Sequence, residues 1–553
     1  MKTGAWPGAI FIEAERPVFL NPVGVRRTPH GPCEQSGASF ENGRVAGCDF
    51  YKGGKARFPE PCGILITINP EGDVCMTENL SMLVDLYEMT MSNGLFDTGK
   101  EETTAYFDLF FRRVPDDGGF AIMAGLEQMT EYLQNLRFSE DEVAYLRGLN
   151  KFDERFLQLL ARFKFTCDVW AVPEGTPIFP GEPIVTVRGP VIQAMLVETM
   201  LLLTINHQSL IATKACRIAR AAQGHTVTEF GARRAHSYDA AVYGARAAYI
   251  GGADSTSNLK AAESFGIPPA GTMAHSWVQL FDDELTAFKA YAAKYPSQCV
   301  LLVDTYNTLK SGVPNAIKAF DEVVVPAGCR PMGIRIDSGD ITYLSKKARK
   351  MLDDAGYPDC HIFVSNSLDE YLIRDMLMQG AKVDNFCVGE RLITASSEAV
   401  FGGVYKLVAT EQDGVITPKI KISENVSKIT LPGFKTCWRL FDRESGKAIA
   451  DVITLANERI DDTQPYEIFD PEYTWKRKTV RDFIARRLLV PVFDAGQLVY
   501  ESPSAQSIKR YCKGQVETLW EEVQRFEKPH KYYVDYSEKL WNLRRGLLSE
   551  KTV

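Results

Sequence analysis

The sequence predicts an α/β fold whose largest part is a parallel (β/α) barrel, and three observations lead to this class. Between residues 191 and 410, apolar runs rich in β-branched residues alternate with helical stretches. Strands of this kind, joined by helices, are typical of parallel sheets with right-handed crossovers. Polar residues follow several of the strands, and ligands bind at that edge of such a sheet.

The composition fits a globular protein of two or three domains. The chain has 553 residues, of which 45% are hydrophobic and 24% charged. A net charge of −8 argues against a nucleic-acid partner, which needs a basic surface. The longest apolar run, Met195 to Ile205, is interrupted by Glu198 and is shorter than the ~18 residues of a membrane span. We therefore expect no membrane partner.

The cysteines and the N-terminus predict a cytoplasmic location. The 12 cysteines form no C-x-x-C pair and there are 7 histidines, so we expect reduced thiols and no zinc site. Acidic residues interrupt the apolar start of the chain too early for a signal peptide. Residues 1–75 are rich in glycine and proline without a sustained period, which predicts a poorly structured N-terminal extension.

Residues 76–190 are predicted to form an N-terminal α+β domain. Helical spacing begins at Ser81, and Tyr106–Arg113 alternates like a strand. Helices follow to about residue 160, with Ser139 and Glu142 spaced as a capping box. Proline and glycine turns then separate short strands up to residue 189.

Residues 191–410 are predicted to form the catalytic barrel. A long apolar helix over about 191–222 opens it, and no Gly-x-Gly-x-x-Gly or P-loop pattern occurs. The number of strands favours a barrel over an open sheet. The strand candidates are Thr226–Phe230, Val300–Val303, Gly333–Ile336, His361–Val364, Val383–Val388 and Val404–Val408.

Residues 411–553 are predicted to be a C-terminal segment that packs with the N-terminal domain. Its first part has antiparallel-looking strands at Val415–Ser423, Cys437–Phe441 and Lys447–Val452, with glycines at the turns. A helical, charged segment rich in aromatic residues follows from about residue 504 to 548.

Polar residues at several strand ends predict one shared pocket. Carboxylates there suit sugar hydroxyls or a divalent cation. Glycine, serine and asparagine let backbone N–H groups approach a phosphate, and arginines with Tyr87 and Phe230 suit a flat anionic ring. A phosphorylated sugar and an aromatic acid are the expected ligands. The strand-end residues are Phe230, Arg233, Asp304, Asp337, Ser338, Gly339, Asp340, Ser365, Asn366, Gly389, Glu390, Gly402 and Gly403.

His275 stands just before a helix predicted to run through Phe288. The positive end of a helix disfavours protonation of the imidazole and favours an anion. A neutral imidazole can act as a nucleophile towards a phosphoryl group. The alternative is a purely structural histidine.

With these residues assembled, the chain resembles the nicotinate phosphoribosyltransferase family from about Asn79 to the C-terminus. The resemblance rests on eight runs in the family's order. They are Asp85-Leu-Tyr-Glu-Met-Thr-Met91, Glu229-Phe-Gly-Ala-Arg-Arg234, Gly251-Gly-Ala-Asp-Ser-Thr-Ser-Asn258, Gly271-Thr-Met-Ala-His-Ser276, Asp304-Thr-Tyr306, Arg335-Ile-Asp-Ser-Gly-Asp340, Val364-Ser-Asn366 and Gly402-Gly-Val-Tyr-Lys-Leu407.

The resemblance implies a fold, an activity and an assembly. The fold would be an irregular, TIM-like (β/α) barrel beside a second α+β domain built from both chain ends. The enzyme would convert nicotinate and 5-phosphoribosyl 1-pyrophosphate into nicotinate mononucleotide and pyrophosphate, the first step of NAD salvage from nicotinate. ATP would be a co-substrate and Mg²⁺ a cofactor. A homodimer with the active site near the subunit interface is implied as well.

The resemblance also implies residue roles. His275 would be phosphorylated by ATP, and Asp304 and Asp337 would lie near the ribose and Mg²⁺. No metal site made of protein ligands alone is expected; Mg²⁺ would come with the substrate, with Asp337 and Asp340 as possible ligands. Nicotinate would contact Tyr87, Phe230, Arg233, Thr272 and Arg335. The phosphoribosyl and phosphate groups would contact Ser338, Gly339, Asp340, Ser365, Asn366, Gly389 and Gly403.

One residue departs from the family pattern. Many relatives have Gly-x-Gly-Thr in the phosphate loop, whereas this chain has Cys387-Val-Gly-Glu390. A glutamate would repel a phosphate unless Glu390 turns away or holds Mg²⁺.

Three other functions stay open at this point. A nicotinamide phosphoribosyltransferase would share the barrel and the phosphoribosyl site. A non-catalytic relative that binds pyridine nucleotides would have no use for a phosphoryl-accepting His275. An aldolase-like phosphosugar enzyme would need a strand-end lysine, for which Lys406 is the obvious candidate.

Overall fold

The computed structural model describes residues 79–425 and 428–551, together with five short strands before residue 79. The chain divides into two compact units, Met1–Thr77 and Glu78–Val553. The early strands are β1 (Arg44–Val45), β2 (Cys48–Tyr51), β3 (Lys55–Ala56), β4 (Ile64–Ile68) and β5 (Val74–Glu78), paired in that order. The prediction of a poorly structured extension over 1–75 falls mostly outside the described residues and stays a prediction.

A seven-stranded sheet joins distant parts of the second unit, in the order β18-β17-β6-β10-β8-β24-β25. The prediction that Val404–Val408 is a parallel strand is wrong, because β17 pairs antiparallel with β6. Local hydrophobicity marks a strand but not the partner that it finds. The strands are β6 (Thr104–Phe111), β8 (Asp168–Ala171), β10 (Val185–Pro190), β17 (Gly403–Gln412), β18 (Val415–Pro418), β24 (Val490–Asp494) and β25 (Gln497–Leu498).

Smaller sheets and helices complete the C-terminal part. The order β23-β19-β20-β26 gives a four-stranded sheet, and β21 pairs with β22. The elements are β19 (Lys435–Asp442), β20 (Ala448–Leu455), β21 (Tyr466–Phe469), β22 (Arg477–Val480), β23 (Phe483–Arg487), α15 (Ala505–Glu517), β26 (Val534–Tyr536) and α16 (Glu538–Lys551). Strands β19 and β20 confirm the antiparallel strands predicted at Cys437–Phe441 and Lys447–Val452, whereas β18 is shorter than the predicted Val415–Ser423. The helical segment predicted from about residue 504 to 548 is present only in part, because residues 518–537, which include β26, separate α15 from α16.

The N-terminal helices are α1 (Leu86–Asp97), α2 (Leu126–Asn135), α3 (Glu140–Gly148) and α4 (Glu154–Ala161), with β7 (Ala121–Ile122) paired to β9 (Pro177–Ile178). The predicted capping box of α3 is confirmed. The Ser139 hydroxyl accepts the Glu142 N–H at 3.2 Å, and the Glu142 carboxylate accepts the Ser139 N–H at 2.6 Å. These two bonds satisfy donors that the first helical turn leaves unpaired.

Two consecutive helices, α5 (Val191–Leu196) and α6 (Glu198–Ala221), form the long apolar helix predicted from the sequence. By length and composition alone, Val191–Ala221 could cross a membrane, but 61% of its most apolar window is buried inside the protein. It packs against α7 (Tyr238–Gly251), α2 and α13 (Glu370–Met378). This stretch therefore behaves as a core helix.

The parallel sheet carries the predicted strand ends. Its order is β12-β11-β16-β15-β14-β13. The strands are β11 (Thr226–Glu229), β12 (Ser255–Thr256), β13 (Val300–Leu302), β14 (Gly333–Ile336), β15 (His361–Val364) and β16 (Asn385–Val388). The prediction of a mixed α/β protein with a parallel sheet is confirmed. Buried apolar side chains on these strands explain why the sequence marks them clearly.

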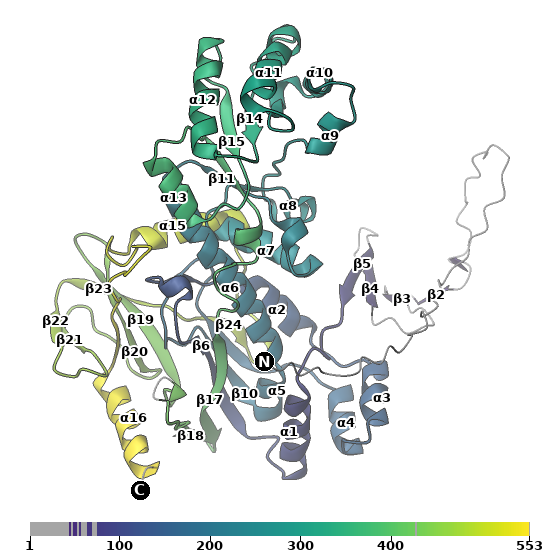
Figure 1. Cartoon of the computed structure of the whole chain (residues 1–553). Helices are drawn as coiled ribbons and strands as arrows, with labels where there is room; N and C mark the ends of the chain where they lie inside the picture. The colour runs from purple at the N-terminus through teal and green to yellow at the C-terminus, as the bar shows by residue number, and fades with distance from the viewer. Residues whose placement is uncertain are drawn as a thin grey trace, which may run out of the picture. The chain divides into compact units, whose positions relative to one another are not determined.

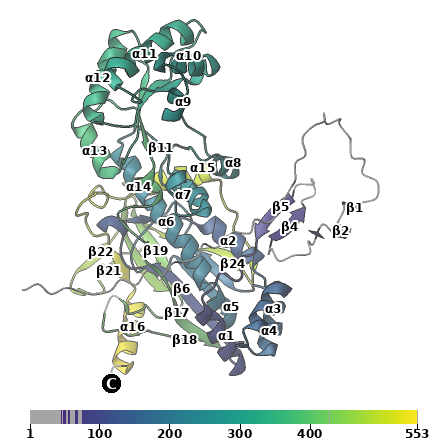
Figure 2. The ribbon, with the colours of Figure 1, turned by 45° about the vertical axis from the view of Figure 1, so that its right-hand side comes forward.

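The sheet is open, so the predicted TIM-like barrel is not confirmed, and no closed barrel is found among the described residues. The strand order follows the chain cyclically and is interrupted only between β12 and β13. The chain between those two strands contains α8 (Leu259–Phe265), α9 (His275–Gln279) and α10 (Glu284–Lys294). Figure 1 shows α10, α11 (Val313–Ala319) and α12 (Ile341–Asp354) gathered around β14 and β15, and Figure 2 shows the same three helices together in a second view. The opening therefore coincides with the segment that contains Thr272 and His275.

Candidate active site

Arg335 is the centre of a polar cluster at the C-terminal edge of the parallel sheet. It is the third residue of β14, and its neighbours Ile334 and Ile336 are fully buried on the opposite face. Its Nη1 donates to the Thr272 hydroxyl at 2.9 Å, and its Nε donates to Ser365 Oγ at 2.9 Å. The guanidinium also lies 5.5 Å from the centre of the Phe230 ring. Three separate loops therefore meet at one arginine.

Asp337 connects Arg335 to the rest of the cluster. Its Oδ1 accepts from Arg335 Nη2 at 3.1 Å and from the hydroxyl of Ser365. Burial alone would raise the pKa of Asp337, but hydrogen bonds from Ser365 and Arg335 and the nearby His275 outweigh it and lower the pKa. The carboxylate is therefore held in its ionised form.

Asp304 follows β13 and lies directly beside Asp337. Its Oδ2 accepts the Asp337 N–H at 2.9 Å and the Ser338 hydroxyl at 2.5 Å. Its Oδ1 is buried, and no group among the described residues donates a hydrogen bond to it. A buried carboxylate oxygen without a partner is unfavourable unless a ligand supplies one. Asp304 therefore offers an oxygen for a cation or a hydroxyl group.

Asp340, which the sequence also assigned to this site, has a structural role in the fold. Its carboxylate accepts the Tyr343 N–H at 2.9 Å and caps the N-terminus of α12. Gly339 before it has a φ of 81°, a conformation that a side chain disfavours. The tight turn from β14 into α12 thus depends on Gly339 and Asp340 together.

His275 is the first residue of α9, which ends at Gln279. The predicted helix through Phe288 is wrong, because a separate helix, α10, starts after its cap residue Asp283. His275 Nδ1 lies 3.1 Å from the Thr305 hydroxyl oxygen, and Nε2 lies 3.6 Å from Asp337 Oδ2. Both ring nitrogens therefore face polar side chains of the cluster.

Thr305 is a residue that sequence reasoning missed. It belongs to the run Asp304-Thr-Tyr306, in which only the aspartate was assigned a role. A hydroxyl directly after a strand-end carboxylate was the available signal. Its contact with His275 becomes visible only when the loop after β13 is placed beside α9.

The turn after β15 is strained. Asn366 has a φ of 90° and Ser367 a φ of 51°, although neither is glycine. Such conformations are uncommon outside glycine and gather at ligand sites, because surrounding structure must hold them. Asn366 is exposed and follows Ser365 of the Arg335 cluster. The predicted phosphate-side position of Asn366 is compatible with this turn.

The arginine pair after β11 lies close to Glu390, the residue that departs from the family pattern. Arg233 and Arg234 are exposed on the short helix Ala232–Arg234. Arg234 Nε lies 3.7 Å from a carboxylate oxygen of Glu390, the first residue of α14 (Glu390–Ile393) after Gly389. Glu390 is thus partly neutralised by Arg234, which reduces the repulsion expected for a phosphate near Gly389.

Comparison with known proteins assigns the chain that contains this cluster to a family. Models of the nicotinate phosphoribosyltransferase (NAPRTase) N-terminal domain, family and C-terminal domain match residues 82–206, 225–389 and 434–544. The Bacillus subtilis nicotinate phosphoribosyltransferase is 44% identical over 467 residues, covering 84% of this chain and 94% of that protein. The chain belongs to the nicotinate phosphoribosyltransferase family.

Further members of the nicotinate phosphoribosyltransferase family are similar to this chain in sequence and in fold. The human enzyme is 31% identical over 524 residues, covering 84% of this chain and 96% of that protein. The crystal structure of human nicotinic acid phosphoribosyltransferase superposes with a TM-score of 0.74 at 30% identity, covering 84% of this chain and all of that one. Nicotinate-nucleotide pyrophosphorylase from Pyrococcus furiosus, with a TM-score of 0.61 at 24% identity, shows a similar fold.

Two residues that the family resemblance assigned to the site are on elements outside the parallel sheet. Tyr87 is on α1, and this helix is at the opposite end of the second unit from β14 and β15 (Figure 1). Burial and the nearby Glu198 raise its pKa to about 12. Gly403 opens β17, where an added Cβ would lie 2.5 Å from Asn206 Oδ1. The parallel sheet that positions Arg335 therefore positions neither of these two residues.

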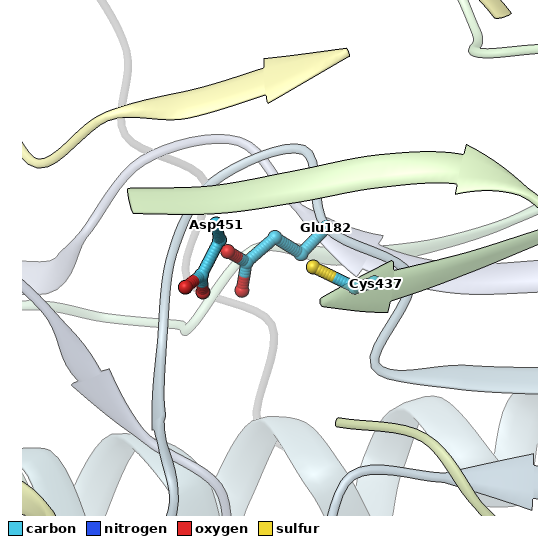
Figure 3. Close-up of side chains that lie close together, drawn as sticks. All are labelled: Glu182, Cys437 and Asp451. Carbon is cyan, nitrogen blue, oxygen red and sulfur yellow. The ribbon is translucent and has the colours of Figure 1, made fainter. Parts of the chain in front are cut away.

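A buried group of Glu182, Cys437 and Asp451 is the cluster among the described residues whose spacing would suit a metal ion (Figure 3). The chemistry of the cluster does not fit one. Arg439 already pairs with Asp451 at 2.6 Å, and Tyr532 donates to Asp451 at 2.9 Å. Burial and then Asp451 raise the pKa of Glu182 well above its ordinary value. A proton and an arginine thus balance the two carboxylates.

Proposed function

We propose that the Arg335 cluster is the site at which nicotinate and 5-phosphoribosyl 1-pyrophosphate form nicotinate mononucleotide and pyrophosphate. Membership of the nicotinate phosphoribosyltransferase family supports the reaction. The observation that carries the location is Arg335, which is 12% exposed, with the Thr272 hydroxyl 2.9 Å away. Both groups can donate to one carboxylate, and the Phe230 ring beside Arg335 suits a flat aromatic acid.

The remaining groups suit the sugar and its departing group. The bond from C1 to the pyrophosphate oxygen breaks as the bond from C1 to the pyridine nitrogen forms. Positive charge develops on the ribose in between, and the carboxylates of Asp304 and Asp337 would stabilise it. The edge of the sheet orients the two reactants, so no covalent bond from the protein to C1 is needed. Ser365, Asn366 and Gly389 would contact phosphate oxygens.

The residues present fit a Mg²⁺ ion that arrives with the substrate. Asp304 Oδ1 is a buried oxygen to which no described residue donates, and carboxylate oxygens are the ligands that Mg²⁺ prefers. Asp337 would be the second carboxylate, whereas Asp340 already caps α12. The ion would supply positive charge to the leaving pyrophosphate.

ATP hydrolysis would be coupled to this site through His275. The imidazole is held between Thr305 and Asp337, and Asp337 in turn contacts Arg335. The charge of a phosphoryl group on His275 would therefore change the interactions of Asp337, and through Asp337 those of Arg335 at the proposed nicotinate and ribose positions.

The test of this coupling is His275→Ala with γ-³²P-labelled ATP. The variant should lose label incorporation and ATP hydrolysis while retaining slow phosphoribosyl transfer without ATP. His361→Ala, at an exposed histidine on β15, is the matched control and should incorporate label like the wild type. Unchanged ATP hydrolysis in the His275 variant would refute the assigned role.

Tyr87 would complete the site from a second subunit of a cytoplasmic homodimer. It is 46% exposed, although its ring is apolar, and its helix α1 lies away from β14, which carries Arg335, within one chain (Figure 1). Tyr87→Ala and Arg335→Ala chains, each nearly inactive alone, should regain activity when coexpressed, because a mixed dimer contains one intact site. Coexpressed variants that stay inactive despite forming mixed dimers would contradict the shared site.

A further inference from the structure

A second candidate binding site lies in the C-terminal part of the protein. A cavity of 1220 Å³ is bounded by the chain after β6, the loop before β10, the β21–β22 hairpin, residues 528–536 and α16. None of its lining residues belongs to the parallel sheet or to the loops that carry the Arg335 cluster. Pockets for small ligands measure about 300–1000 Å³, so a molecule as large as a nucleotide has room here.

The charge of this cavity is opposite to that of the whole protein. Nine lysines and arginines line it against five aspartates and glutamates, although the chain has a net charge of −8. Some of these cations are neutralised by neighbours, as Lys435 is by Asp108 at 2.8 Å. Others have no carboxylate within 4.0 Å in the described part of the chain. These are Lys476, Lys478, Lys528, Lys531 and Arg544.

A buried acid complements these cations. Asp535 on β26 is 4% exposed and lines the cavity. Burial and then Asp470 raise its pKa to about 6, and Lys531 opposes this shift. The wall beside it contains the stacked rings of Phe179 and Tyr532, whose centres lie 3.9 Å apart. A carboxylate that lines the cavity beside cations suits a ligand that has a hydroxyl or amino group as well as negative charge.

We propose that this cavity binds a phosphate-bearing small molecule such as a nucleotide. Its phosphate groups contact Lys531 and Arg544, and a hydroxyl or amino group donates to Asp535. Unpaired lysine and arginine side chains are the groups that recognise phosphate by charge-assisted hydrogen bonds. The cavity is separate from the catalytic edge, so both sites can be occupied in one chain.

Equilibrium dialysis of the full chain with labelled ATP tests the proposal. We expect Lys531→Glu/Arg544→Glu to bind one ATP fewer per chain than the wild type, or to bind it with a Kd at least about tenfold higher. Nicotinate mononucleotide formation at saturating substrate should not change. Lys260→Glu/Lys350→Glu, at exposed helical lysines, makes the same change in charge and should bind like the wild type.

An additional variant and competing ligands distinguish ATP binding in this cavity from ATP binding at the catalytic edge. Arg335→Ala should retain the cavity-bound ATP, whatever the catalytic edge does. Inorganic phosphate and AMP should compete for the cavity, whereas adenosine should not, because it has no phosphate. If the double variant is unstable, Lys531→Gln serves in its place. ATP binding at wild-type stoichiometry and Kd in the cavity variants, or displacement by adenosine, would overturn the proposal.

Discussion

Two arginine–aspartate ion pairs in this protein have similar nitrogen–oxygen distances but different surroundings. Arg439 and Asp451 lie 2.6 Å apart, with both side chains fully buried between β19 and β20. Arg335 and Asp337 lie 3.1 Å apart at the edge of the parallel sheet, with 12% and 27% of their side chains exposed. Arg439 also donates to the Pro177 carbonyl, whereas Arg335 contacts the side chains of Thr272, Ser365 and Phe230.

The comparison shows that exposure and partners distinguish a site from a structural contact. A fully buried pair has given up its water, so losing either partner leaves an unpaired charge in the core. The Arg335 pair is still reached by solvent, and a substrate can replace some of its hydrogen bonds. We therefore expect mutation of Arg439 to affect folding and mutation of Arg335 to affect catalysis.

The largest effect is expected for Arg439→Met. The free energy of unfolding should fall by about 3–5 kcal/mol, because Asp451 is left as a buried unpaired charge. Urea denaturation followed by circular dichroism measures it. Arg439→Met/Asp451→Leu should recover part of the loss, and Arg335→Met should change stability by less than about 1 kcal/mol. Equal losses for the two arginine variants would remove the distinction between the pairs.

Arg335→Ala tests the other side of the comparison. We expect kcat/KM for nicotinate to fall by about 10²–10³-fold, because a principal donor to the substrate is lost. The melting temperature should stay close to that of the wild type. Arg330→Ala, which removes a half-exposed arginine paired with Asp359, is the control and should retain full activity. Normal nicotinate turnover in Arg335→Ala would contradict the assignment.

A smaller effect is expected at Thr305. Thr305→Val keeps the shape of the side chain but removes the hydroxyl 3.1 Å from His275 Nδ1. ATP-dependent turnover should fall about tenfold, with little change in the slow reaction without ATP. Thr305→Ser, which restores the hydroxyl, should regain most of the coupling. Loss of both reactions in equal measure, or no rescue by serine, would show that Thr305 acts only through packing.

The smallest effect concerns pH and the buried Glu182. Its folded pKa is raised by burial and then by Asp451, so the folded protein keeps a proton that the unfolded chain loses above about pH 4.3. Stability from this group is therefore full below the unfolded pKa and falls as the pH rises towards the folded pKa. Glu182→Gln should flatten this decline in urea titrations between about pH 5 and pH 8. An unchanged slope would mean that Glu182 is ionised in the fold.

The sequence predicted the strands of the parallel sheet more successfully than their arrangement. β14 and β15 have the predicted bounds, because short apolar runs between turns are a local signal. The two-residue strand β12 was missed, since Ser255 and Thr256 have no such pattern. Two features of the arrangement depend on contacts between residues that are distant in the chain, so local patterns do not show them. They are the opening of the sheet between β12 and β13 and the pairing of β17 with β6.

The residues of the candidate site could also be predicted better than the contacts between them. Polar residues at strand ends indicated a shared pocket, and the structure brings Thr272, Asp304, Arg335, Asp337 and Ser365 into one hydrogen-bonded cluster. Periodicity could not show that Asp340 is used as a helix cap. The role of Thr305 depends on a loop and a short helix that lie 30 residues apart in the chain.

Substrate choice tests the central claim most directly. Purified protein is assayed with nicotinate and with nicotinamide, each with 5-phosphoribosyl 1-pyrophosphate and Mg²⁺ and each with and without ATP, and mononucleotide is quantified by chromatography. We expect nicotinate mononucleotide to form faster in both conditions and ATP to accelerate it, because the proposed site places Arg335 and Thr272, which lie 2.9 Å apart, where both would donate to a carboxylate. Faster turnover of nicotinamide than of nicotinate would contradict the account.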